Sequence, residues 1–149
     1  MKEVIIAVIV LLFLVVLVIV PNIKILSKNH AMVIERFGVF LKVIEEPGVY
    51  ILIPLFDRAI QVVCLDQMER KFTFSMPSEN DTITYMVDYY YQVTDVKLFV
   101  YSALDALSVF EKKIKYYLTN FIPIDDKIFH ELKEHAENFG IELKSIVSK

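Results

Sequence analysis

The chain opens with an unbroken hydrophobic run. Residues Val4–Val20 contain no polar side chain, and Ile23 and Ile25 can extend the apolar stretch. As a helix this run would be roughly 26 Å long at about 1.5 Å per residue, close to the thickness of bilayer hydrocarbon. The pattern therefore predicts a single transmembrane helix that anchors the protein through residues 1–25.

Two other interpretations of this run stay open. A cleaved signal peptide would have a charged leader of only Met1–Glu3, an apolar core longer than is usual, and no small-x-small site directly after it. A buried core helix is the second alternative. A retained anchor explains the run best, because so long an apolar surface would not stay in water.

Basic residues on the two sides of the run predict its orientation. Lys24, Lys28 and Arg36 follow the run, whereas Lys2 and the amino terminus precede it. The positive-inside rule then places the carboxyl-terminal body in the cytoplasm of a single-pass membrane protein.

Patterns typical of strands fill the next part of the chain. Glu45–Gly48 forms a turn signal, in which Pro47 presets φ and Gly48 is free to take a positive φ. The apolar run after this turn does not alternate, which predicts a strand covered on both faces and closed by Pro54. The clearest alternation of hydrophobic and polar positions covers Ile83–Val93. It predicts a half-buried antiparallel strand with one face more exposed to water than the other. The predicted strands are His30–Phe37, Val39–Ile44, Val49–Ile53, Ala59–Leu65, Met68–Met76, Ile83–Val93 and Ile141–Val147.

The hydrophobic period then changes to three and four residues. This spacing from Leu104 to Phe121 predicts an amphipathic helix, and a second apolar face follows over Ile128–Phe139. Together with the strands, the two helices predict a mixed α+β fold. The residues expected to begin or end these helices are Pro123, Asp125 or Asp126, and Gly140.

Composition limits the range of functions. The sequence has 149 residues, a mean hydropathy of +0.50 and a formal net charge of -3. The part after the anchor, about 125 residues, is enough for one ordinary domain. Acidic and basic residues are interspersed, so nothing favours a nucleic-acid partner. Cys64 is the one cysteine, which excludes an intramolecular disulfide, and its apolar neighbours predict a core residue.

The residue patterns of common enzymes are not found. His130–His135 reads HELKEH, but a zinc helix needs histidines four apart, about 40° from each other, and here they are five apart, about 140°. Three glycines cannot build a phosphate loop, and there is no GxSxG. His30 and Cys64 are weak grounds for nucleophilic catalysis. We therefore expect no catalytic site, no metal and no cofactor.

Two motifs resemble a known family. A V-x-E-R-x-G stretch is formed by Val33, Glu35, Arg36 and Gly38. A P-G-x-x-x-x-x-P-x-x-D-R stretch is formed by Pro47, Gly48, Pro54, Asp57 and Arg58. Supporting landmarks are Ser78–Thr82, Val87–Asp88, Tyr91–Val93, Asp95, Tyr101, and Gly140 with Ile141. On these residues the chain resembles the stomatin/prohibitin/flotillin/HflK-C superfamily, also called SPFH or band 7, over essentially its whole length.

The resemblance implies a membrane-tethered α+β domain that acts as an oligomeric scaffold. It implies an SPFH domain over residues 26–149, with a membrane-proximal β-rich part (26–76) and an α/β part (77–149). Family members organise membrane microdomains and regulate channels or membrane proteases. The motif residues, Gly140 included, would then be structural.

The resemblance also gives the second apolar run a role. Family members lay their first subdomain against lipid, so Leu52, Pro54, Leu55 and Phe56 are candidate membrane-contact residues. The alternative is that the run is a covered strand, which we expect for about half of its side chains.

The chain departs from the family in two places. Stomatin-like proteins usually continue into a long Ala/Glu-rich helix that drives ring or cage assembly, which does not follow Lys149 here. We therefore expect small oligomers or association through the domain faces. The helix from Leu104 has lysines near the position of a frequent arginine, so no contact is transferred there.

Three functions compete. The first is a non-enzymatic scaffold that self-associates and modulates a partner membrane protein. The second is an accessory subunit of a membrane protease. The third is a membrane-tethered hydrolase.

Overall fold

A computed structural model describes residues 1–77, 82–120, 122 and 124–148. The chain forms two compact units, Met1–Val62 and Val63–Lys149. An apolar amino-terminal helix precedes a strand-rich body with several helices, which confirms the α+β prediction. The landmark turn expected at Ser78–Thr82 (apart from Thr82), the end of an apolar stripe at Phe121 and the helix break at Pro123 lie outside the described residues.

The first unit begins with a fully exposed apolar helix. Helix α1 (Lys2–Ile19) continues into the short 3-10 helix η1 (Val20–Asn22), and neither has a buried residue. Among the described residues this is the one helix long and apolar enough to cross a membrane. Strand β1 (Ile23–Leu26) starts immediately afterwards, so Ile23 and Ile25 belong to a strand rather than to an extended helix.

Two small sheets make up the rest of the first unit. Strand β1 pairs antiparallel with β4 (Gly48–Ile51). The second sheet has the order β3–β2–β5, formed by β3 (Val39–Ile44), β2 (His30–Arg36) and β5 (Asp57–Cys64). A hydrophobic core joins the sheets and consists of Leu26, Met32, Ile34, Ile44 and Leu52, with Tyr50 and Ala59 against it.

The prediction that both faces of the strand after Glu45–Gly48 are covered is wrong. Val49 and Ile51 are exposed, while Tyr50 and Leu52 turn towards the core. The β1–β4 ladder has two strands and packs on the core through one face. A continuous apolar run cannot reveal this, because its exposed positions are as hydrophobic as its buried ones.

The second unit is built on an antiparallel sheet with the order β6–β7–β8. Its strands are β6 (Met68–Pro77), β7 (Thr82–Val93) and β8 (Ile141–Ser148). The alternation predicted for β7 is confirmed, because Val87, Tyr89, Tyr91 and Val93 are buried. Strand β6 pairs with β7 over ten positions, so it belongs with the second unit and not with the part that was expected to end at residue 76.

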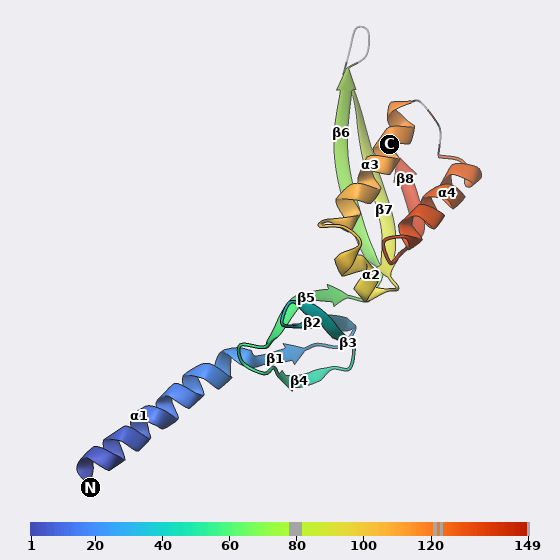
Figure 1. Ribbon diagram of the computed structural model, residues 1–149. Helices are drawn as coiled ribbons and strands as arrows, with labels where there is room; N and C mark the ends of the chain where they lie inside the picture. The colour runs from blue at the N-terminus through green and yellow to red at the C-terminus, as the bar shows by residue number, and fades with distance from the viewer. Residues whose placement is uncertain (78–81, 121, 123, 149) are drawn as a thin grey trace. The chain divides into compact units, whose positions relative to one another are not determined.

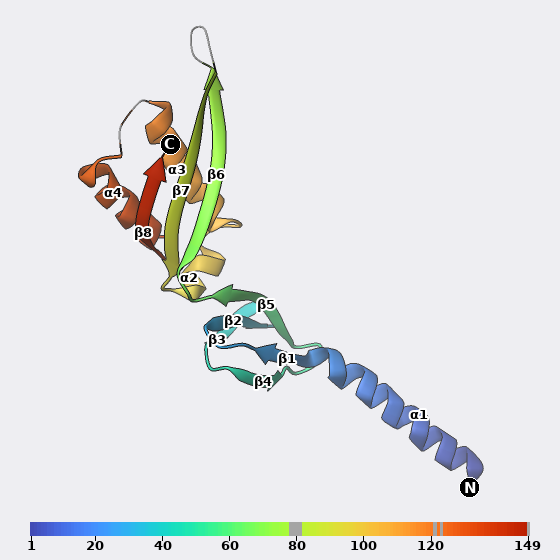
Figure 2. The same ribbon diagram turned by 180° about the vertical axis from the view of Figure 1, so that it is seen from behind.

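Three helices complete the second unit: α2 (Val96–Tyr101), α3 (Ala106–Thr119) and α4 (Asp126–Glu137). Figures 1 and 2 show α3 and α4 on one face of the sheet, with the opposite face uncovered. Each helix has an aspartate N-cap, and the cap of α4 is Asp125. Helix α2 was not predicted, because six residues show too little periodicity. Leu104 is fully exposed and precedes α3, so its place on the apolar stripe was wrong.

The three glycines are used differently. Gly38 and Gly140 have φ of +77° and +69°, which glycine adopts at little cost. Gly48 is not among the residues with positive φ and instead pairs with Leu26 at the start of β4. The expected use of its conformational freedom is therefore wrong.

Candidate membrane-contact surface

The turn between β2 and β3 displays a large apolar side chain. Phe37 and Gly38 have φ of +53° and +77°, and the flanking residues Arg36 and Val39 pair across the hairpin. A two-residue hairpin turn with two positive φ values normally takes Asn-Gly. Here the first position is Phe37, with 73% of its surface exposed. Sterics alone would not place a phenylalanine there.

The loop between β4 and β5 repeats this arrangement. The N–H groups of Phe56 and Asp57 both donate to the Ile53 carbonyl, at 3.2 and 2.9 Å. Pro54 presets the turn, and Leu55 follows with φ of +69° at a place where glycine or asparagine is usual. Leu55 is 97% exposed. A second bulky apolar residue therefore occupies a left-handed position in full contact with solvent.

The two loops lie against each other. The Phe37 N–H donates to the Phe56 carbonyl at 3.0 Å, and the rings of the two residues are 5.0 Å apart. Phe37, Ile53, Leu55 and Phe56 are all exposed, and we call this group the apolar tip.

A charged pair, Arg36 and Asp57, connects the two loops that carry the apolar tip. Arg36 donates to both carboxylate oxygens of Asp57, through Nε at 2.6 Å and Nη2 at 3.1 Å. The Ile53 N–H donates to the same carboxylate at 3.2 Å and so fixes the start of the loop. The hydrogen bond from Arg36 lowers the pKa of Asp57 and raises the pKa of the guanidinium. These two family-motif residues thus hold the two loops together.

The lowered pKa of Asp57 gives a prediction for pH. A carboxylate with a depressed folded-state pKa contributes stability above its unfolded pKa, about 3.9, and loses it as pH falls through the folded value. The apolar tip should therefore stay closed at neutral pH and open only below about pH 4. Hydrogen exchange of the Ile53 amide should show this acid-induced opening.

The Asp57→Asn substitution tests the role of this carboxylate. We expect about tenfold faster exchange of the Ile53 amide at neutral pH, because the bond to a charged acceptor is weakened, and no remaining acid transition in the loop. Arg36→Lys, which keeps the charge but cannot form the two-pronged bond, should give a smaller increase. An unchanged Ile53 amide in Asp57→Asn would contradict this role of the carboxylate.

The apolar tip lies next to the end of the apolar helix. The Leu52 N–H donates to the Asn22 carbonyl at 2.9 Å, and Ile23 pairs with Ile51. Asn22 is itself tied to the helix, because its side chain donates to the Val18 carbonyl at 2.8 Å. The backbone that leads into the apolar tip is thus hydrogen-bonded to the last residue of the helical segment.

An exposed aliphatic face adjoins this junction. The β1–β4 register pairs Ile23 with Ile51 and Ile25 with Val49, and paired residues of an antiparallel ladder share a face. All four are exposed. We call this group the β1–β4 outer face. With the apolar tip, it gives the first unit a large solvent-facing apolar surface close to the end of α1, of the kind that marks an interaction site.

The residues expected to contact the membrane differ in their exposure. Leu55 and Phe56 are exposed and Pro54 is half-buried, but Leu52 is 5% exposed and belongs to the core. Leu52 cannot face lipid, because its side chain fills the space between the two sheets. Sequence reasoning missed Phe37 and Ile53. The Phe-Gly pair between two strands was the available signal, since a two-residue turn displays its first side chain.

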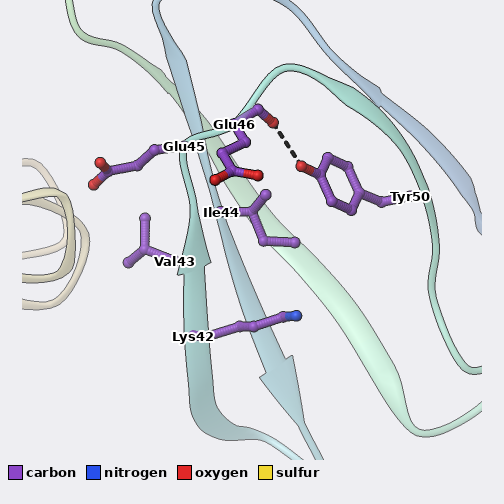
Figure 3. Close-up of a pocket in the computed structure, with 6 residues that line it drawn as sticks. All are labelled: Lys42, Val43, Ile44, Glu45, Glu46 and Tyr50. Carbon is purple, nitrogen blue, oxygen red and sulfur yellow. Dashed lines mark hydrogen bonds between the residues drawn. The ribbon is translucent and has the colours of Figure 1, made fainter.

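The remaining motif residues lie in the first unit, except Gly140. Glu35 lies at an irregularity in the β2–β3 ladder, and Arg58 is exposed on β5. Pro47 belongs to the Glu45–Gly48 turn, which Tyr50 braces by donating its hydroxyl to the Glu46 carbonyl at 2.7 Å. Figure 3 shows this brace at the rim of a shallow hollow beside Lys42 and Ile44. Val43, Glu45 and Glu46 complete its lining.

The histidine segment of α4 does not assemble a metal site. Within the described residues, no group of three or more His, Cys, Asp or Glu side chains could hold a metal ion. The ring of His135 packs edge-on against Phe139 at 5.2 Å. Burial lowers the pKa of His135, as does the nearby Lys113. The expected absence of a metal and a cofactor stays a prediction.

A comparison with known protein families gave a match. A family model described as "SPFH domain / Band 7 family" matches residues 24–142, which include most of β1, the apolar tip and most of the second unit. A search of curated proteins found no match.

Proposed function

Because the chain belongs to the SPFH domain / Band 7 family, we propose that it is a membrane-anchored scaffold whose apolar tip enters the lipid interface beside its own anchor. Proteins of this family are in general membrane-associated scaffold or regulatory proteins without enzymatic activity, and their domains typically oligomerise. The apolar helix α1 fits a single-pass anchor.

The observation that carries the proposal is the backbone strain at the apolar tip. A left-handed conformation costs a non-glycine residue roughly 1–2 kcal/mol, and both Phe37 and Leu55 adopt it. Glycine would remove this strain and asparagine would tolerate it, and neither would expose an apolar side chain to water. Strained residues with exposed apolar side chains are typical of functional contacts. A lipid interface next to α1 provides the apolar environment that both side chains lack in water.

The scaffold would act through position rather than through bond chemistry. The anchor and the apolar tip together give the first unit several points of contact with the bilayer, so the orientation of that unit on the surface is fixed. We propose that copies held in this way self-associate and organise or modulate partner membrane proteins, such as a channel. By the distribution of Lys24, Lys28 and Arg36, the body lies on the cytoplasmic side.

A depth measurement tests the proposal. A polarity-sensitive label is attached at Leu55→Cys in a Cys64→Ser background, with the full chain in lipid vesicles. Leu104→Cys is the matched control, because Leu104 is an equally exposed leucine of the second unit. We expect an apolar environment and quenching by brominated lipid at position 55, and an aqueous environment at position 104. A label at position 55 that reports bulk water would end the proposal.

The alternative function is an accessory subunit of a membrane protease, as the prohibitin-like branch of the family suggests. Native mass spectrometry of the protein extracted from its own membranes in mild detergent separates the two. Assemblies of this chain alone favour the scaffold. A second, different chain present in every assembly favours the accessory subunit.

A further inference from the structure

Within the part of the chain that the structure describes, strand β6 leaves one edge of the second sheet open. The order β6–β7–β8 gives β6 a single neighbour, and β6 is ten residues long. Both views show β6 at the border of the sheet, with α3 and α4 over one face (Figures 1 and 2). A long free edge carries backbone N–H and C=O groups that can pair with another strand.

The centre of this edge lacks the usual protection against pairing. Natural edge strands are blunted by charged residues, especially lysine, or by proline. In β6 the charged residues occur early, at Glu69–Lys71, and the proline comes last, at Pro77. The five residues Phe72–Met76 between them are uncharged, and Thr73 and Ser75 face solvent.

The charges of β6 are already engaged within the unit. Arg70 donates to Glu111 of α3 at 2.7 Å, and Lys71 lies 2.9 Å from Glu69. The strand therefore has its charges held at one end and an unprotected stretch in its middle. This distribution favours a partner strand that meets the uncharged part.

We propose that β6 pairs antiparallel with β6 of a second copy of this chain, about a two-fold axis at Thr73. This proposal rests on the self-association in the proposed function and assigns it a surface. In this register Phe72 lies opposite Phe74 of the second copy, and Thr73 lies opposite its own equivalent. Lys71 meets Ser75, so no like charges are opposed. Aromatic pairs and Thr–Thr pairs are among the favourable cross-strand combinations.

Other registers are less favourable. Parallel pairing in register would place each Lys71 beside its own copy, and like charges destabilise a ladder. Two-fold axes at residues 70 or 71 would oppose Arg70 or Lys71 to itself. The axis at Thr73 opposes neither Arg70 nor Lys71 to itself. It also places the Phe72 and Phe74 side chains of one copy beside those of the other, and within one copy these two rings are 6.1 Å apart.

The pairing closes on itself. A two-fold axis perpendicular to the sheet keeps α3 and α4 of both copies on the same face of a six-stranded sheet. The interface is isologous, so this edge forms a dimer and stops. The long carboxyl-terminal helix of stomatin-like proteins is not needed for this step.

Disulfide crosslinking tests the register. Thr73→Cys is prepared in a Cys64→Ser background, as full-length protein in phosphatidylcholine vesicles. Residues directly opposite in an antiparallel pair have Cα atoms about 4.5–5.5 Å apart, within the range that a disulfide spans. Thr84→Cys is the matched control, because Thr84 is an exposed threonine on the neighbouring strand β7, opposite Ser75. We expect at least about tenfold faster crosslinking at position 73. Equal or slower crosslinking at position 73 overturns the proposal.

A charge variant tests the interface by a second route. Thr73→Lys opposes two lysines at the axis and should weaken dimerisation at least tenfold, whereas Thr84→Lys should leave it unchanged. Circular dichroism checks that both variants stay folded. If Thr73→Lys does not fold, the crosslinking experiment alone tests the interface. Oligomers that persist unchanged in Thr73→Lys overturn β6 pairing but leave self-association intact. A wild-type chain that stays monomeric in vesicles overturns the self-association itself.

Discussion

Replacing Gly140 with alanine should be more destabilising than the same replacement at Gly38 or Gly48. Gly140 has φ of +69°, and its carbonyl accepts from the N–H groups of Thr94 and Asp95 at 2.9 and 3.1 Å. A Cβ at this position would collide with the Asp95 carbonyl and lie 2.9 Å from the Phe99 nitrogen. Both obstacles are backbone atoms and cannot rotate away.

The expected loss in free energy of unfolding combines two terms. The left-handed conformation costs an alanine roughly 1–2 kcal/mol, and forcing an atom into a packed site costs roughly 1–3 kcal/mol. Urea unfolding in detergent, followed by near-ultraviolet circular dichroism of the buried tyrosines, measures the sum for the second unit.

Gly38→Ala is the matched control. Gly38 has φ of +77°, but a Cβ there meets nothing within 4 Å. Gly38 lies in the first unit, so unfolding of this variant is followed there, by the near-ultraviolet signal of Tyr50, which packs against that unit's core. The control should lose only the conformational term of roughly 1–2 kcal/mol. If both variants lose the same free energy, the contact between Gly140 and the Asp95–Phe99 backbone does not limit the fold.

Replacing Leu55 with asparagine should change stability and membrane docking in opposite directions. Asparagine tolerates the left-handed conformation of this position, so the free energy of unfolding in detergent should stay equal or rise by about 1 kcal/mol. Removing a leucine from lipid costs roughly 1.5–3 kcal/mol. The ratio of docked to free apolar tip should therefore fall about ten- to a hundredfold.

A tryptophan at Phe37 serves as the reporter, since the sequence has no native tryptophan. Quenching by brominated lipid measures the docked fraction with and without Leu55→Asn. Leu104→Asn is the control and should leave the quenching unchanged, because Leu104 belongs to the second unit. Equal quenching in all three proteins would show that Leu55 does not enter the interface.

The outline of the fold could be predicted because its signals are local. The polar-free run predicted α1, and strict alternation over Ile83–Val93 predicted β7 with the correct buried face. A cap was expected at Asp125 or Asp126, and Asp125 is the N-cap of α4, while Gly140, expected as the helix stop, follows the C-cap Asn138 by two residues and has a positive φ. Each of these signals depends on the geometry of one segment and not on its partners.

The candidate surface could be predicted only in part. Two exposed residues of the apolar tip, Leu55 and Phe56, were expected from the motif, whereas Leu52 was misplaced and Phe37 was missed. Buried and exposed residues in this loop have the same hydrophobicity. The side that each one faces depends on contacts between distant parts of the chain, such as the Arg36–Asp57 pair, which joins residues twenty-one positions apart.

The sequence by itself determined that an apolar helix precedes an α+β body, and that the body belongs to one family over residues 24–142. Only the tertiary structure decided which apolar side chains are left outside. The physical reason is that the hydrophobic effect favours removing an apolar side chain from water, but does not specify whether it packs in the core or against another surface. Loop pairing and strand order determine the outcome. Leu52 lies in the core, Phe37 lies beside Phe56, and the uncharged centre of β6 lies at an open edge.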